Sequence, residues 1–138
     1  MAEKKNKSIK IGIIQQSPDL GGAEFFMLAL LTEFKNLDNE VILAANAGKY
    51  FNQAQKENIE TQKLPGIMDV MGNTRGLVKT IVFLPFYLIF YLNLLWKWKK
   101  AKVDVILMSG FSEKIFVSFL SIILFSSLYI LYRCGSLL

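Results

Sequence analysis

Short apolar runs alternate with longer helical patterns along the whole chain. The runs are six to eight residues long, and most are rich in isoleucine, valine or leucine without regular polar alternation. This pattern is typical of strands that are covered on both faces. The runs lie at residues 8–15, 40–45, 59–64, 103–109 and 128–133. We therefore predict five short strands.

The segments between these runs are predicted to be helices, because they carry strong helix formers or helically spaced apolar residues. They cover residues 23–35, 50–58, 77–102 and 113–127. The first is apolar on most faces and is expected to be largely buried, whereas the second is short and polar. The third is predicted as one long helix that Pro85 kinks or ends in its first turns. The fourth has Ser112 as its N-cap.

Glycine and proline residues mark the connections. Residues 17–22 form a turn sequence after the first run, and residues 65–76 hold three glycines without a clear period, which predicts a mobile loop. Strands and helices that alternate with such connections predict βαβ units. The fold class that follows is α/β: a Rossmann-like parallel sheet of about five strands with helices on both faces, in a single domain at 1–138.

Two stretches without charge leave an alternative open. Residues 80–96 and 115–132 have 17 and 18 residues and no charged side chain, close to the ~20 residues that a spanning helix needs. As a hairpin, they would put the lysine-rich N-terminus and the basic segment between them on opposite sides of a membrane. The positive-inside rule opposes that topology. A small membrane protein with two spanning helices is thus the alternative to a covered sheet.

The composition excludes several classes of function. With 53% hydrophobic and 20% charged residues, the 138-residue chain is not intrinsically disordered. It has no histidine and one cysteine, Cys134, which excludes Ser-His and Cys-His nucleophile systems and His-containing zinc sites. No metal or cofactor is expected. The net charge of +5 is concentrated late, between very apolar segments. This distribution suits an anionic membrane surface better than nucleic acid, and a solvated helix end is the other interpretation.

An aromatic stripe lies directly before the late basic cluster. The stripe lies along the predicted long helix and comprises Phe83, Phe86, Tyr87, Phe90, Tyr91 and Trp96, with Trp98 after it. Lys97, Lys99 and Lys100 follow or interleave with its end. Trp and Lys at the end of an apolar helix are favoured by a lipid headgroup region. The stripe therefore indicates either an interfacial helix or a core helix with a solvated end.

Candidate chemistry lies after the strands, because ligands of an open parallel sheet bind beyond its carboxyl ends. Gly21-Gly22-Ala23-Glu24 joins the first strand to the first helix. Glycines let backbone N–H groups approach a phosphate closely, and a helix N-terminus favours an anion. The other interpretation is a plain turn in which Glu24 complements the helix dipole.

Two further groups follow later strands. Ser109, Gly110 and Phe111 connect the run at 103–109 to a helix, and Arg133 and Cys134 follow the last run. Arg133 can bind a phosphate or carboxylate with two N–H groups, or form a salt bridge. Cys134 has no histidine to activate it and is expected to be a small buried residue.

Taken in order, these motifs resemble the N-terminal domain of glycosyltransferase family 4. Its members show a strand, a loop ending in Gly-Gly-Ala-Glu, an apolar helix, a His-Glu-Val second strand and a later Pro-Asp-Val-Ile strand. Here Asn39-Glu40-Val41 and Val103-Asp104-Val105-Ile106 take the places of the two later motifs. The resemblance runs through nearly the whole chain, and its distinctive part is the Gly-Gly-Ala-Glu loop. Cys134 stands where the family often has a histidine.

The resemblance implies the acceptor-binding half of a two-domain GT-B enzyme. Such an enzyme transfers a sugar from a nucleotide sugar to a glycan or lipid-linked acceptor, with retention at the anomeric carbon. The donor diphosphate loop would comprise Gly21, Gly22, Ala23 and Glu24. The acceptor side would comprise Ser109, Gly110, Phe111 and Arg133. No catalytic residue is assigned.

The resemblance also implies a missing partner. The family's second domain, with its nucleotide pocket, has no counterpart in these 138 residues, so we expect a truncated or split product that is inactive alone. A C-terminal glycosyltransferase domain from a separate or downstream chain would complete it. The expected location is cytoplasmic, or peripheral on the inner face of the plasma membrane. A non-catalytic nucleotide-binding α/β module is the remaining alternative.

Overall fold

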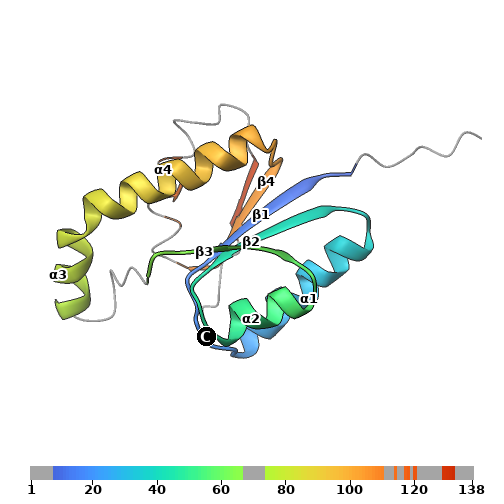
Figure 1. Ribbon diagram of the computed structural model, residues 1–138, viewed down its shortest axis with the longest axis horizontal. Helices are drawn as coiled ribbons and strands as arrows, with labels where there is room; N and C mark the ends of the chain where they lie inside the picture. The colour runs from blue at the N-terminus through green and yellow to red at the C-terminus, as the bar shows by residue number, and fades with distance from the viewer. Residues whose placement is uncertain are drawn as a thin grey trace, which may run out of the picture.

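Five parallel strands form one sheet in the order β3-β2-β1-β4-β5 (Figure 1). The computed structural model describes residues 8–66, 74–110, 114, 117, 118, 120 and 129–132. The strands are β1 (Lys10–Gln15), β2 (Glu40–Ala45), β3 (Glu60–Lys63), β4 (Val105–Met108) and β5 (Tyr129–Tyr132). Each predicted run forms a strand, so the predicted α/β fold with a parallel sheet is confirmed.

The described residues include four complete helices. They are α1 (Gly22–Asn36), α2 (Lys49–Lys56), α3 (Thr74–Val82) and α4 (Leu84–Lys100). Lys114, Val117, Ser118 and Leu120 are also helical. They belong to the helix predicted at 113–127, of which the other positions, and Ser112, lie outside the described residues.

The sheet separates two apolar cores, with α1 and α2 on one face and α4 on the other (Figure 1). In β1 and β2, Ile13 and Leu43 pack toward α1 and α2, whereas their neighbours Ile14 and Ile42 pack toward α4. Successive strand side chains point to opposite faces. A strand between two layers must therefore be apolar at nearly every position, which explains the runs without polar alternation.

Trp98 is the largest fully buried side chain, and β1 has a glycine where it lies. A Cβ built on Gly12 would come 2.5 Å from Trp98 Cζ3, closer than atoms can pack. The indole Nε1–H donates a hydrogen bond to Gln62 Oε1 of β3 at 3.0 Å. Gly12 thus makes room for the ring that joins α4 to the sheet.

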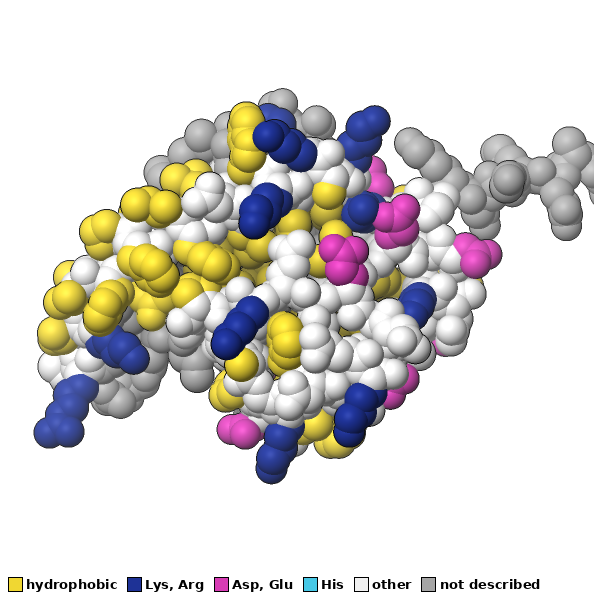
Figure 2. All heavy atoms as spheres, in the orientation of Figure 1, with side chains coloured by type: hydrophobic (Ala, Val, Ile, Leu, Met, Phe, Trp, Pro, Cys, Tyr) yellow, Lys and Arg dark blue, Asp and Glu magenta, His cyan; other side chains and the backbone are white. Residues whose placement is uncertain are grey.

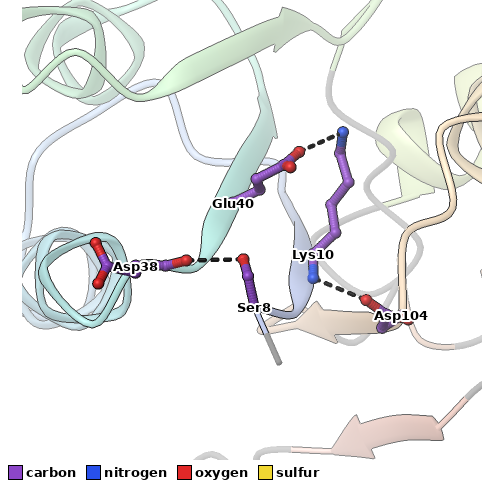
Figure 3. A network of polar contacts seen from close by, with 5 residues as sticks. All are labelled: Ser8, Lys10, Asp38, Glu40 and Asp104. Atoms are coloured by element: carbon purple, nitrogen blue, oxygen red, sulfur yellow. Dashed lines mark hydrogen bonds and ion pairs between the residues drawn. The ribbon is translucent and has the colours of Figure 1, made fainter. Parts of the chain in front are cut away.

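Polar contacts tie the amino ends of β1, β2 and β4 together (Figure 3). The Lys10 backbone N–H donates to Asp104 Oδ2 at 2.8 Å, and Lys10 Nζ lies 2.7 Å from Glu40 Oε2. Ser8 Oγ donates to the Asp38 carbonyl oxygen at 2.7 Å. These contacts lie at the edge opposite the carboxyl ends of the strands, where they support the register of the central strands.

The predicted long helix is interrupted near Pro85, as the sequence predicted: α3 ends at Val82, and α4 starts at Leu84 with Pro85 in its first turn. Proline fits that position since its missing N–H has no helical partner there. Residues 74–76 are helical rather than part of the predicted loop at 65–76, and residues 67–73 lie outside the described residues.

α1 is also less buried than predicted. Its buried side chains are Met27, Leu28 and Leu31, whereas Phe25 and Phe26 are 59% and 50% exposed. Only one side of the helix faces the sheet, so the apolar residues on its other side have no layer above them in the described part of the chain.

No helix in the described ranges is both long enough and apolar enough to cross a membrane. Of the two stretches that suggested spanning helices, 80–96 is divided at Phe83, and residues 129–132 of the second form β5. These parts belong to the sheet and its covering layer, contrary to the two-span alternative.

Candidate functional site

The strand order reverses beside β1. The chain builds β2 and β3 on one side of β1 and then crosses over to build β4 and β5 on the other side. In such a sheet the carboxyl ends of the two strands at the reversal leave a crevice, which is the usual ligand position. Because Ile14 pairs with Met108, the loops that begin after Gln15 and at Ser109 emerge side by side. Both loops contain candidate residues predicted from the sequence, the Gly21–Glu24 motif in the first and Ser109 and Gly110 in the second.

The glycine loop leads from β1 into α1. Gly21 is the N-cap of α1, with extended backbone angles (φ −109°, ψ −174°), and Gly22 is the first helical residue. A Cβ on Gly22 would meet nothing within 4 Å, and one on Gly21 would meet only the carboxylate of Glu24. Neither conformation nor crowding within the described structure requires glycine at position 22. The open space above it can accept a ligand that approaches the backbone closely.

Glu24 caps the helix and anchors it to the sheet. Its Oε2 accepts a hydrogen bond from the Gly21 N–H at 3.0 Å, and its Oε1 accepts one from Gln15 Nε2 at 3.1 Å. A carboxylate in the first turn also complements the helix dipole. Glu24 therefore holds the loop in place, which agrees with the structural interpretation given to it above.

Gln15 and Tyr50 extend this chain of hydrogen bonds into the core. The Tyr50 hydroxyl donates to Gln15 Oε1 at 2.9 Å, and both side chains are buried. Burial, and to a smaller extent the negative charge of Glu24, raise the pKa of the Tyr50 hydroxyl well above its ordinary value. The hydroxyl is thus a fixed proton donor that orients the Gln15 amide. Neither residue was predicted from the sequence, although the polar Gln15 at the end of an apolar run was an available signal.

The loop after β1 rests on the turn after β2. A Cβ on Gly48 would lie 2.1 Å from the Pro18 carbonyl oxygen, so only glycine permits this contact. Tyr50 N–H donates to the same oxygen at 3.4 Å. Asn46 begins this turn and is 5% exposed, and its amide Oδ1 and Nδ2 have no hydrogen-bond partner in the described part of the chain. Asn46 is a third polar residue beside these loops that the sequence patterns did not indicate.

The loop after β4 and the helix α4 lie on the other side of the strand-order reversal. Ser109 and Gly110 follow β4 directly and are half-buried. Gln16 Nε2 donates to the Tyr91 hydroxyl of α4 at 2.6 Å, so α4 is linked to the loop after β1. Phe111 and Arg133 lie outside the described residues. Within the described ranges, no three acidic, cysteine or histidine side chains gather to hold a metal ion.

This arrangement matches solved structures, although no family model and no curated protein matches the sequence. A Rickettsia africae glycosyltransferase superposes with a TM-score of 0.66 at 17% identity, over 91% of this chain and 29% of that chain. Anabaena HepE, solved with UDP and glucose, gives a TM-score of 0.61 at 12% identity, over 93% and 30%. Acinetobacter baumannii MurG gives 0.60 at 17% identity, over 91% and 34%.

The likeness defines a fold: a Rossmann-like half of the GT-B type, as the sequence resemblance predicted. The chain spans about a third of the length of these three glycosyltransferases. The C-terminal domain of a Pyrococcus furiosus hydrogenase also superposes, with a TM-score of 0.62 at 11% identity over 91% of this chain and 90% of that domain. At such identities the likeness shows the fold alone.

Proposed function

We propose that this chain is the acceptor-side half of a nucleotide-sugar-dependent glycosyltransferase, of the retaining type that the sequence resemblance implies. The acceptor would be a glycan or a lipid-linked sugar. A second Rossmann-like domain, supplied by another part of the protein or by another chain, would carry the nucleotide pocket. The donor diphosphate would lie between the two halves.

The observation that carries this proposal is the open space over Gly22 at the strand-order reversal. Three features support an anionic ligand there: the N–H groups of the first helical turn, which have no partner within the helix, the helix dipole, and the absence of any described atom beyond the local backbone within 4 Å of a Cβ at position 22. Glu24 and Gln15 hold the loop from below. In this assignment the residues of the Gly21–Glu24 loop face the donor phosphates, and Ser109, Gly110, Phe111 and Arg133 lie toward the acceptor.

A titration of the ¹⁵N-labelled chain with UDP-glucose, followed by amide chemical shifts, tests the donor loop. We expect weak binding, with a Kd of about 1 mM or above, equivalent to about −4 kcal/mol, because the isolated half lacks the main nucleotide pocket. The shifts should cluster at Gly21, Gly22 and Gly110. Gly22→Val should abolish them by filling the open space, whereas Ala29→Val, on the exposed side of α1, should leave them unchanged.

Two results of this titration would contradict the proposal. Chemical-shift changes only at residues away from the carboxyl ends of the strands would show that the glycine loop is a plain turn. Micromolar affinity would instead indicate a self-sufficient nucleotide-binding module, which is the alternative function. A separate assay with radiolabelled UDP-glucose and extracted lipid or glycan acceptors should show no sugar transfer by the 138-residue chain alone, and transfer in this assay would overturn the expected need for a second half.

A further inference from the structure

α4 is apolar on two faces, and only one of them packs on the sheet. Tyr87, Tyr91, Leu95 and Trp98 form the inner face and are buried. The outer face of α4 and the adjoining α3 expose large apolar side chains, including Val78, Ile81, Val82, Phe86, Ile89 and Trp96, at 48–67% of their surface. Figure 2 shows such side chains gathered over α3 and α4. We call this surface the α3–α4 face.

The α3–α4 face is also where the positive charge of the protein lies. Residues 74–102 contain six basic residues and no acidic one, whereas the remainder of the chain has ten basic and eleven acidic residues. Arg75 and Lys79 lie on α3, and Lys97, Lys99 and Lys100 end α4. All five are exposed. The net charge of the chain therefore comes from the segment that exposes the most apolar surface.

Trp96 lies at the boundary between the apolar and the basic part of this face. It is 48% exposed, and Lys99 Nζ and Lys100 Nζ lie 5.8 and 5.6 Å from its ring centroid. This order of side chains matches the layers of a lipid surface: the apolar side chains would meet the acyl chains, the tryptophan the interface, and the lysines the anionic headgroups. A second copy of the chain fits less well, because the same basic residues would face one another across a two-fold axis.

We propose that the α3–α4 face docks onto an anionic lipid bilayer, with Phe86 and Ile89 entering the interface and the lysines contacting headgroup phosphates. α4 also contacts the candidate site through the Tyr91 hydroxyl. Docking by this face would therefore hold the carboxyl edge of the sheet close to the membrane, where a lipid-linked acceptor would lie. This last link rests on the proposed function, whereas the docking itself does not.

Vesicle flotation with the 138-residue chain tests the docking. We expect binding to vesicles of phosphatidylglycerol and phosphatidylcholine, weakening with salt, and little binding to phosphatidylcholine alone. The triple variant Lys79→Glu, Lys97→Glu and Lys100→Glu should bind at least about 100-fold more weakly, because each basic residue near an anionic surface contributes about fivefold. The matched control is Lys49→Glu, Lys56→Glu and Lys63→Glu, which changes three exposed lysines outside the face and should keep far more of the binding.

The apolar contribution is tested separately. Phe86→Ser with Ile89→Ser should weaken binding by at least about tenfold, since two exposed apolar side chains would no longer leave water. The control Phe25→Ser with Leu37→Ser removes exposed apolar groups from the α1 side and should have little effect. All four variants change exposed positions and should keep the circular dichroism spectrum of the native chain.

The two tryptophans provide a direct readout of the docked face. Brominated phosphatidylglycerol should quench Trp96 in the native chain, whereas the Trp96→Phe variant retains only the fully buried Trp98 and should be quenched little. Equal binding to neutral and anionic vesicles, or equal effects of face and control variants, would overturn the proposal. The proposal would also be overturned if the native chain did not bind vesicles and instead self-associated, and if the Phe86 and Ile89 changes abolished that self-association. A failure here leaves the UDP-glucose titration unaffected, so the two proposals can fail separately.

Discussion

Three side chains decide how the candidate loop is held. Glu24 accepts from Gly21 and Gln15, and Gln15 accepts in turn from Tyr50. Each of these hydrogen bonds gives a partner to a polar group that is buried or that lies at the start of α1. A buried polar group without a partner lowers the free energy of unfolding by about 1–3 kcal/mol. The sequence analysis selected Glu24 from its place in the motif. The pairing of Gln15 with Tyr50 could not be predicted, because residues 35 positions apart meet only when β1 and α2 are packed on the same core.

Tyr50 should make the stability of the protein depend on alkaline pH. Its pKa is raised in the folded state, so the folded chain keeps the hydroxyl proton after the unfolded chain has begun to lose it near pH 10. The stabilising contribution is thus complete below about pH 10 and falls above it, by up to about 1.4 kcal/mol per pH unit.

Urea unfolding of the native chain and of Tyr50→Phe, between pH 7 and 11.5, measures this contribution. The variant should be less stable by about 1–3 kcal/mol at neutral pH, because Gln15 Oε1 loses its donor, and the difference should shrink as the pH rises above 10. A difference that stays constant with pH would show that the Tyr50 hydroxyl titrates alike in both states.

Packing between elements accounts for features that local patterns did not reveal. Gly12 looks like a weak point in an isoleucine-rich strand, yet its missing side chain accommodates Trp98 from α4. Gly48 likewise permits the turn after β2 to contact Pro18. Pro85 was correctly predicted to interrupt the long helix, and the structure places the break at Phe83, two residues before it. The sequence predicted a local backbone break, whereas each close approach depends on a residue far away in the chain.

Gly12→Ala should destabilise the protein by about 1–3 kcal/mol, because the added methyl group would overlap the Trp98 ring and force the sheet and α4 apart. Gly22→Ala is the matched control, since its Cβ meets nothing within 4 Å. It should be neutral or stabilising by up to about 1 kcal/mol through reduced freedom of the unfolded chain. Urea unfolding compares the two. Equal losses would mean that glycine is needed at both positions for the backbone and not for packing.

At the level of the whole molecule, β1 is the central element. It pairs with β2 on one side and β4 on the other, and it contributes side chains to both cores. The edge strand β3 pairs only with β2 among the described strands, and two of its four residues are exposed and two half-buried. The free energy of opening should therefore be highest for residues at the centre of the sheet and lowest for those in its edge strands.

Native-state amide hydrogen exchange tests this order. The amides of Ile13 and Leu43 should exchange most slowly, by global unfolding, whereas that of Thr61 in β3 should exchange through smaller local openings. The dependence of each exchange rate on low urea concentrations separates the two routes. Exchange of Ile13 as fast as Thr61 would show that the sheet does not unfold around a β1 core.

The sequence by itself determined the order and type of the elements and the presence of a glycine loop after the first strand, because these depend on local spacing, turn residues and strand-like apolar runs. Only the tertiary structure decided which loops share an edge, which residues hold them, and which apolar face of α4 is left exposed. Those outcomes depend on strand order and helix placement. Many contacts between distant residues together determine the strand order and the placement of the helices. No local segment of the sequence predicts either of them.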